Sequence, residues 1–444
     1  MISQCGFRFL FALLLATLVL PGFANAESLK PQGSPRALQN YVDAKDDSYE
    51  WKLLGQHELP QNLGKVYNVQ LTSQTWQGMK WTHLLAVFEP ARLTHPKHCL
   101  LFITGGRTGS KVRDGDLLVG AKLANMTGTR CAFLLQVPNQ PLMGDKFEDD
   151  LISETFLKYL ESGDETWPLL FPMTKSAVKA MDAIQELSQD LWKNQIEKFV
   201  VTGASKRGWT TWLTGVVDDR VAGIAPIVID TLNLQPQMKH QIDIWGKYSV
   251  QIEDYTSKGL IEVMQNQPDG PLWKWVDPYT YRKELKLPKL LINGTNDPYW
   301  VLDALNIYWD GLVGQKHLLY VPNAGHGLGD GKEFALMTLA AFVKHIASDT
   351  PMPQMQWKHT QPNGQLQLSV SATPKPTAVK LWSAKSDSGD FREVKWTSSP
   401  MARNGKGHQG AIPKPAQGHA AIYAEVQFVI QGLKYSLATQ IHRE

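Results

Sequence analysis

The stretch Phe199-Val-Val-Thr-Gly-Ala-Ser205-Lys-Arg-Gly208-Trp209 places a serine between a short apolar run and a segment able to form a helix. The run 199–202 has the length and character of a buried strand, and Gly203 follows it directly. A serine on a sharp turn from strand to helix projects its Oγ from the edge of a sheet, and such a turn needs small neighbours. The stretch therefore indicates an α/β architecture with Ser205 as a candidate nucleophile.

The stretch departs from the usual G-x-S-x-G pattern of such turns. Arg207 occupies the second small position, and Gly208 comes one residue late. An ordinary Gly-Ser turn without a catalytic role therefore stays possible on this segment alone. If Ser205 is the nucleophile, the backbone N–H of Lys206 at the start of the helix would face the developing oxyanion.

Short apolar runs elsewhere predict further strands of the same sheet, and they alternate with segments of helical period. This alternation favours a mostly parallel sheet covered by helices on both faces, preceded by two antiparallel strands. The predicted strands span 66–71, 82–88, 100–104, 132–137, 199–202, 224–229, 290–293 and 318–321. Helices are expected from Thr174, as N-cap, to about 191 and over 334–346.

Two of these strands are followed by loops that carry a carboxylate and an imidazole. Asp297 ends the run Asn-Gly-Thr-Asn-Asp, and His326 lies in Asn-Ala-Gly-His-Gly. Sites in open α/β sheets gather at the carboxyl ends of strands, so we expect these groups to meet Ser205. His326 would act as base and Asp297 would orient it. Asp303 is a rival acid, which we expect within a helix.

An oxyanion hole would need a second N–H besides that of Lys206. The strand that ends in Gly105-Gly106 makes Gly106 or Arg107 the candidate donor, with a plain glycine turn as the alternative. Lys206 and Arg207 allow two interpretations. Either one of them, Lys206 in preference to Arg207, favours an anionic substrate, with Arg207 also a candidate substrate-binding residue, or Arg207 points away and pairs with a structural carboxylate.

Two further segments extend the predicted hydrolytic domain, 27–350. The long insertion at about 230–287 is rich in aromatic residues and is interpreted as a cap over the site, or as an extra packing layer. Trp245 within it and Trp300 beyond it are candidate substrate contacts. After prolines at 351 and 353, short alternating runs predict a small β-sandwich over 355–444. The runs are 366–370, 378–382, 393–397, 421–428 and 435–440.

The N-terminus has the order of a secretory signal peptide: Arg8, an apolar run over 9–20, and the small residues Ala24 and Ala26. The run is too short for a membrane anchor, so we expect cleavage after Ala26 and a periplasmic or secreted protein. In such a compartment Cys99 and Cys131 can form a disulfide or remain two buried thiols, and both alternatives stay open.

Composition excludes several classes of protein. The formal net charge is only +3 and no polybasic run occurs, which argues against nucleic acid as a partner. The histidines lack ligand spacing with cysteines or carboxylates, so no metal is predicted. Gly105-Gly106 lacks the lysine of a phosphate loop, and no cofactor is expected. The substrate is expected to be a small molecule or a peptide, and the oligomeric state is undetermined.

Four segments together resemble the PhoPQ-activated pathogenicity-related proteins. They are Leu38-Gln-Asn-Tyr41-Val-Asp43 with Asp47 and Tyr49-Glu-Trp51, then Gly203-Ala-Ser-Lys-Arg-Gly-Trp-Thr-Thr-Trp212, then Gly294-Thr-Asn-Asp297 with Trp300 and Asp303, and Gly325-His326. The resemblance covers nearly all of the mature chain. It implies an α/β-hydrolase fold and an exported bacterial protein linked to a two-component regulon, but no known substrate.

We therefore expect an exported serine hydrolase that cleaves an ester or peptide bond through an acyl-enzyme. Two alternatives remain. A secreted eukaryotic growth repressor is similar to the same family, which allows a binding or signalling protein without turnover. Glucuronoyl esterases also place a basic residue after the serine and a glycine at the third position, as Lys206 and Gly208 do here, which allows a carbohydrate esterase.

Overall fold

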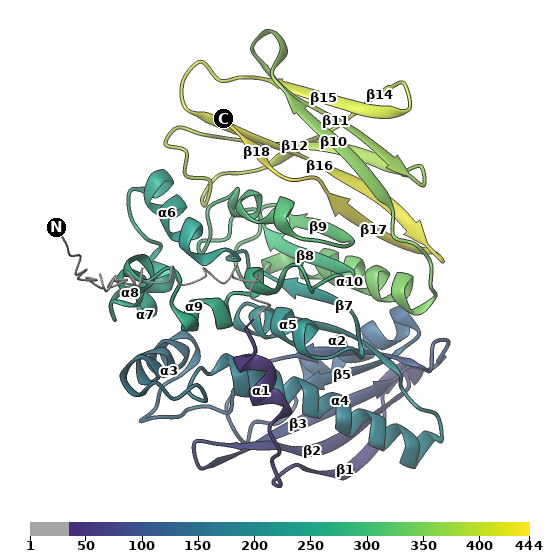
Figure 1. Cartoon of the computed structure of the whole chain (residues 1–444). Helices are drawn as coiled ribbons and strands as arrows, with labels where there is room; N and C mark the ends of the chain where they lie inside the picture. Colours follow the sequence, from purple (N-terminus) through teal and green to yellow (C-terminus); the bar gives the residue numbers. More distant parts are fainter. Residues whose placement is uncertain (1–34) are drawn as a thin grey trace, which may run out of the picture. The chain divides into compact units, whose positions relative to one another are not determined.

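A nine-stranded sheet forms the centre of the larger part of the chain (Figure 1). The structure is a computed structural model that describes residues 35–444, so the predicted signal peptide, 1–26, lies outside the described residues. The strand order is β1-β2-β3-β5-β4-β6-β7-β8-β9. Its strands are β1 Glu50–Glu58, β2 Lys65–Trp76, β3 Met79–Glu89, β4 His98–Ile103, β5 Arg130–Leu134, β6 Lys198–Ala204, β7 Val221–Ile227, β8 Lys289–Gly294 and β9 Lys316–Val321.

Strand directions identify the fold. β1, β2, β3 and β5 pair antiparallel in turn, whereas every pair from β5 through β4, β6, β7 and β8 to β9 is parallel. The exchanged order of β4 and β5, with one antiparallel strand at the start, is the topology of the α/β-hydrolase fold, extended here by β1. All residues of β5 and β8 are buried, because helices cover both faces of the parallel part.

Helices cover the two faces of the sheet in separate groups. α1, α4 and α5 lie on one face, and α2 and α10 lie together on the other (Figure 1). Apolar side chains on the two faces form two separate core clusters. The helices are α1 Ala37–Asp43, α2 Asp114–Thr127, α3 Glu148–Ser162, α4 Leu170–Trp192, α5 Lys206–Val217 and α10 Lys332–Ala347.

α4 begins earlier than the sequence pattern predicts. Thr174 was expected as the N-cap, but it lies inside the helix, and its hydroxyl donates to the Leu170 carbonyl at 2.8 Å. Pro172 lies in the first helical turn, where a residue needs no intrahelical N–H bond, so the proline does not prevent an earlier start.

The insertion between β7 and β8 folds into short helices. They are α6 Leu234–Trp245, α7 Glu253–Thr256, α8 Leu260–Asn266 and α9 Pro271–Val276, with 3-10 turns at Val250–Ile252 and Pro278–Tyr281. α7 packs on α3, and α8 packs on α6 and α7. Figure 1 shows these helices together with α3 on one side of the sheet.

The C-terminal strands form two antiparallel sheets that pack on each other. One has the order β10-β11-β15-β14, and the other has β13-β12-β16-β17, with β18 paired to β16. The strands are β10 Gln354–Thr360, β11 Gln365–Thr373, β12 Ala378–Ser386, β13 Thr397–Pro400, β14 Ala402–Asn404, β15 Gly407–Pro413, β16 His419–Ile430, β17 Leu433–Ala438 and β18 His442–Arg443. Buried residues of both sheets, such as Leu368 and Ile422, fill the space between them.

One predicted strand of this sandwich is misplaced. The run 393–397 was expected to be a strand, but β13 begins only at Thr397. The carbonyls of Phe391, Arg392 and Val394 instead accept hydrogen bonds from the Asn296 side chain, at 3.2, 3.2 and 2.8 Å. A side chain from the loop after β8 therefore occupies one backbone group of the predicted strand, the Val394 carbonyl.

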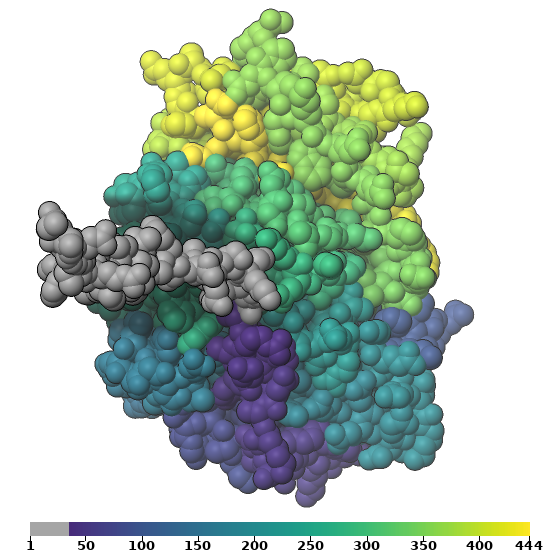
Figure 2. Space-filling model, in the orientation of Figure 1, coloured from purple at the N-terminus to yellow at the C-terminus, as the bar shows by residue number. Residues whose placement is uncertain are grey.

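The sandwich and the sheet domain are joined by polar contacts at the loops after β8 and β9. Besides Asn296, the Asn323 side chain exchanges two hydrogen bonds with the backbone of Trp396, at 3.1 and 2.7 Å. β17 also packs along β9 and α10. The space-filling view shows the light-green and yellow residues of the sandwich lying directly on the green and teal residues of the sheet domain (Figure 2).

Cys99 and Cys131 are free and buried. β4 and β5 are neighbouring parallel strands, but the register pairs Leu100 with Cys131 and Cys99 with Arg130. Side chains alternate between the faces of a sheet, so a shift of one residue puts the two thiols on opposite faces. Cys99 belongs to one core cluster and Cys131 to the other, and no disulfide joins them.

Candidate active site

Ser205 lies on the turn between β6 and α5 in a strained backbone conformation. Its φ is 57° and ψ is −126°, a region that residues other than glycine seldom adopt. Its own N–H donates to the Ile227 carbonyl at 2.8 Å. A Cβ on Gly203 would lie 2.7 Å from the Arg207 carbonyl oxygen, and one on Gly208 would lie 2.7 Å from Ile229. The close approach of α5 to both strands therefore requires glycine at the late position 208.

His326 lies between Ser205 and Asp297. Its Nε2 is 2.9 Å from Ser205 Oγ, and its Nδ1 is 2.8 Å from Asp297 Oδ2. The second oxygen of the buried Asp297 carboxylate accepts the Tyr299 N–H at 2.9 Å. The Tyr299 ring stacks on the imidazole at 4.0 Å. The structure thus brings the three predicted residues together in one hydrogen-bonded series, an arrangement that can activate a serine hydroxyl.

Asp303, the rival acid, has other partners. It precedes a 3-10 turn at Ala304–Ile307 instead of lying within a helix as expected. Its two oxygens accept from His240 at 2.7 Å and from Arg443 at 2.9 Å. Burial opposes its charged form, but these two partners outweigh burial and lower the pKa of Asp303. Its carboxylate therefore links the cap helix α6 to the C-terminal strand.

The two cations after Ser205 are paired with carboxylates of α3. Arg207 donates through Nη1 and Nη2 to Glu148 at 2.6 and 2.8 Å, and through Nε to the Val137 carbonyl at 2.6 Å. Lys206 Nζ lies 2.9 Å from Glu148 and 3.0 Å from Asp149. Despite burial, these cations lower the pKa of Glu148. Arg207 thus pairs with a carboxylate of α3, as the second of the two interpretations expects.

The loop after β4 lies against the same arginine. A Cβ on Gly105 would lie 2.3 Å from Arg207 Nη2, so only glycine leaves room for the guanidinium there. Gly106 has a φ of 124°, and the Arg107 guanidinium lies over the Phe147 ring at 5.4 Å. Lys206 is the first residue of α5, so its N–H has no acceptor within the helix. Gly106 or Arg107 as second oxyanion donor stays a prediction.

Sequence reasoning missed α3 and its carboxylates. Glu148, Asp149 and Asp150 form the first turn of α3, and Gly163 ends it in a left-handed conformation. An acidic first turn, apolar residues at helical spacing and a C-terminal glycine together form a start-and-stop signal that could have revealed this helix.

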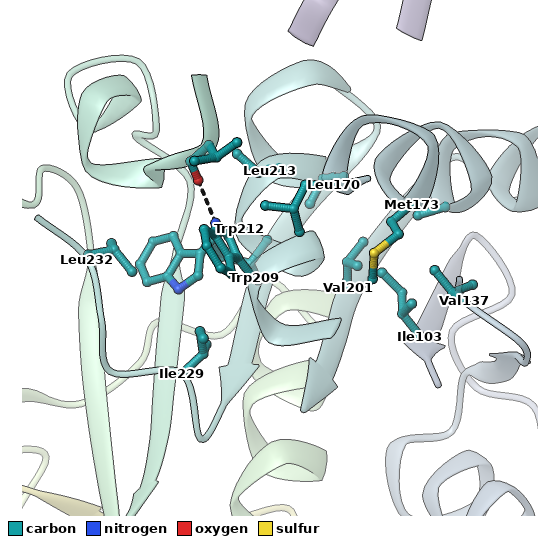
Figure 3. Packing of buried hydrophobic residues seen from close by; sticks show 14 of the residues in the cluster. Ile103, Val137, Leu170, Met173, Val201, Trp209, Trp212, Leu213, Ile229 and Leu232 are labelled. Carbon is teal, nitrogen blue, oxygen red and sulfur yellow. Dashed lines mark hydrogen bonds between the residues drawn. The ribbon is translucent and has the colours of Figure 1, made fainter. Parts of the chain in front are cut away.

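An apolar pocket opens beside Ser205, and the insertion between β7 and β8, the predicted cap, forms part of its wall. Its wall combines α3, α5, the segment after β7 and the cap helices. The apolar lining residues are Phe156, Trp209, Ile229, Leu234, Met238, Ile252, Tyr255, Ile261, Met264, Trp273, Tyr299 and Trp300. Figure 3 shows Trp209 and Trp212 of α5 facing Ile229 and Leu232. The Trp209 Nε1–H donates to the Val276 carbonyl and so ties α5 to the cap.

Of the two predicted aromatic contacts, only Trp300 lines this pocket. Trp245 lies at a separate polar cavity behind Asp297, where the Arg392 guanidinium covers its ring at 4.1 Å. The structure therefore does not bring Trp245 to the nucleophile.

The model of one protein family, the PhoPQ-activated pathogenicity-related proteins, matches residues 38–392. The chain belongs to this family. The match includes Ser205, Asp297, His326 and the whole cap, and it ends within the sandwich.

Individual proteins similar to this PhoPQ-related chain include one curated relative. Autocrine proliferation repressor protein A of Dictyostelium discoideum is 32% identical over 427 residues, which cover 88% of this chain and 86% of that protein. Among solved structures, acetyl xylan esterase 1 from a Thermoanaerobacterium species has a TM-score of 0.48 at 16% identity. It covers 70% of this chain and 91% of its own. Glucuronoyl esterase from Solibacter usitatus has a TM-score of 0.46 at 11% identity, with coverages of 70% and 91%.

The polar cavity behind Asp297 in this PhoPQ-related protein contains a second buried carboxylate. Asp230 accepts the Tyr308 hydroxyl at 2.5 Å. Burial raises the pKa of Asp230 to about 7, and the nearby Asp297 and Asp303 carboxylates add to the rise while Tyr308 opposes it. Asn293 Nδ2 and the Tyr320 hydroxyl, both at this cavity, have no partner among the described residues.

Residues 35–444 contain no cluster of His, Cys, Asp and Glu arranged to hold a metal ion. Within the same residues, no helix is both long and apolar enough to cross a bilayer.

Proposed function

We propose that this PhoPQ-related protein is a serine hydrolase that cleaves an ester or peptide bond through an acyl-enzyme on Ser205. The observation that carries the proposal is the unbroken hydrogen-bonded series from Asp297 through His326 to Ser205 Oγ. The strained backbone at Ser205 supports it, because such strain persists where a side chain must be held in position.

Each side chain has a defined task in the proposed reaction. As Ser205 Oγ attacks the carbonyl carbon, His326 Nε2 takes its proton and later gives that proton to the leaving group. Asp297 holds the Nδ1 proton and stabilises the imidazolium. The oxyanion would lie at the Lys206 N–H, with Gly106 or Arg107 as second donor. Water then attacks the acyl-enzyme with His326 again as base.

The alternatives are less well supported. A carbohydrate esterase for acidic sugars would use a cation after the serine, but Lys206 and Arg207 are already paired with Glu148 and Asp149. A signalling role without turnover, suggested by the name of the Dictyostelium relative, gives no reason for an intact Ser205–His326–Asp297 series.

The proposed location is the periplasm or the exterior, with Glu27 as the mature N-terminus. The basis is the signal-peptide pattern over 1–26.

A fluorophosphonate probe tests the proposal without knowledge of the substrate. The mature wild-type protein should acquire one phosphonyl group on Ser205, measured by intact mass and peptide mapping. Ser205→Ala should acquire none while keeping its circular dichroism spectrum. Ser257→Ala, at an exposed serine of the cap, serves as matched control and should label like wild type. Absence of labelling in folded wild type would favour the signalling role.

A further inference from the structure

The pocket under the cap indicates what kind of substrate the proposed hydrolase accepts. We infer that this pocket binds the acyl part of the substrate and that this part is a short, uncharged aliphatic group. The inference rests on the proposed function, because it needs Ser205 to be the atom that receives the acyl group.

The position of the pocket separates the acyl part from the leaving group. Its lining includes Ser205 and Lys206, whose N–H would hold the oxyanion, but His326 is not among the described lining residues. The leaving group must lie at His326 Nε2 to receive its proton. The group that stays on Ser205 is therefore the one that enters the pocket.

The lining selects against charge. The charged groups at the pocket already have partners: Lys206 lies between Glu148 and Asp149, and Asp149 also accepts the Tyr255 hydroxyl at 2.9 Å. The remaining wall is aliphatic, aromatic and thioether, apart from the Thr231 hydroxyl and the Trp300 Nε1–H, which are uncharged and have no partner among the described residues. A charged acyl group would lose its water here without gaining a free counter-ion, which is costly.

Size limits the aliphatic group. The pocket has a free volume of about 70 Å³. An engineered cavity of ~150 Å³ holds one benzene ring, so about half that volume accommodates roughly three carbons. Each methylene buried here should raise the acylation rate about fourfold until the pocket is full.

Alkanesulfonyl fluorides test this inference whether the natural bond is an ester or a peptide bond. Ser205 Oγ attacks the sulfur, the O–S bond forms as the S–F bond breaks, fluoride leaves and His326 takes the serine proton. The alkyl chain then occupies the acyl position. We would measure second-order rate constants by intact mass for the methane-, propane- and octanesulfonyl fluorides. The rate constant for propanesulfonyl fluoride should exceed that for methanesulfonyl fluoride by roughly fifteenfold, because its chain has two more methylenes. The rate constant for octanesulfonyl fluoride should be no higher than that for propanesulfonyl fluoride.

Two pocket variants and one matched control locate the effect. Met238 of α6 is 3% exposed and lines the pocket, whereas Ile242, one turn along the same helix, is 39% exposed and does not. Met238→Trp should fill the pocket and bring the propane-to-methane ratio close to one, while Ile242→Trp keeps the wild-type ratio. Met264→Ala should enlarge the pocket and raise the octane-to-propane ratio above that of wild type.

The outcomes separate this inference from the proposed function. Suppose that a fluorophosphonate labels wild-type protein at Ser205 but that methane- and propanesulfonyl fluoride react at equal rates. This result would overturn the pocket assignment, and the proposed hydrolase function would still stand. The same holds if Met238→Trp and Ile242→Trp change the ratio alike. If no reagent modifies Ser205 in folded protein, the proposed function and this inference both fail.

Discussion

Replacing Asp297 by asparagine keeps the shape of the site but reverses one hydrogen bond. The carboxylate holds the Tyr299 N–H with one oxygen and His326 Nδ1 with the other. In the variant, the Tyr299 N–H keeps its hydrogen bond by donating to the side-chain oxygen of the introduced asparagine. The NH2 group of that side chain must then face His326 Nδ1. Because that group donates, Nδ1 has to accept, and the ring proton moves to Nε2 beside Ser205 Oγ. A ring protonated at Nε2 cannot take the serine proton.

The expected loss follows from this change of tautomer. An equivalent acid-to-amide change in a serine protease lowers turnover by about 10⁴, which corresponds to ~5 kcal/mol of transition-state stabilisation. We expect a similar loss in the rate of phosphonylation at Ser205, measured by intact mass over time. Protein stability should change little, since the side-chain volume is the same.

Asp303→Asn is the matched control for this prediction. It makes the same change in charge in the next carboxylate along the chain, which faces His240 and Arg443. Its labelling rate should stay within about tenfold of wild type, because it has no contact with the imidazole. If Asp303→Asn loses more activity than Asp297→Asn, the acid has been assigned to the wrong residue.

Two further predictions concern buried groups outside the triad. Burial raises the pKa of Asp230 to about 7, so between about pH 4 and 7 its carboxyl group is protonated in the folded protein but ionised in the unfolded chain. The free energy of unfolding therefore falls as the pH rises through this range. The free energy of unfolding of Asp230→Asn, measured in urea, should therefore rise relative to that of wild type by about 3 kcal/mol between pH 5 and 8. A difference between the two proteins that does not change with pH would contradict this. Burial raises the pKa of Cys99 to about 12, and both Cys99 and Cys131 should react with a thiol reagent only after unfolding, with a Tm unaffected by reductant. An intact mass two hydrogens lower, in native protein, would show a disulfide instead.

The local signals that sequence reasoning used were those of strands and of loops at strand ends. Buried parallel strands such as β8 are short continuous apolar runs. The residues at which such a strand begins and ends can therefore be predicted from the sequence. The carboxyl ends of parallel strands lie at one edge of the sheet, and this rule predicts that Asp297 and His326 lie near Ser205. The geometry of the candidate site was therefore largely predictable, although its catalytic role stays a proposal.

What sequence reasoning missed depends on contacts between distant segments. Glu148 neutralises the cations at 206 and 207 from a helix about sixty residues away, and no local pattern reveals that pairing. The misplaced strand at 393–397 has a similar cause, since Asn296 takes the Val394 carbonyl, which the alternating pattern would assign to a sheet. Whether Cys99 and Cys131 can form a disulfide depends on the register of β4 and β5, which places them one residue out of step. The apolar runs in the sequence do not predict this register.

Asn296 and Asn323 connect the C-terminal sandwich directly to the two loops that carry Asp297 and His326. Asn296 is the immediate neighbour of Asp297, and it bonds to three carbonyls of the sandwich. Asn323 lies on the His326 loop and bonds to Trp396. Damage to the sandwich, such as a protease cut between its strands, would thus reach the imidazole without touching the pocket. Loss of these contacts should therefore lower the proposed activity by displacing Asp297 and His326, while the lining of the pocket stays in place.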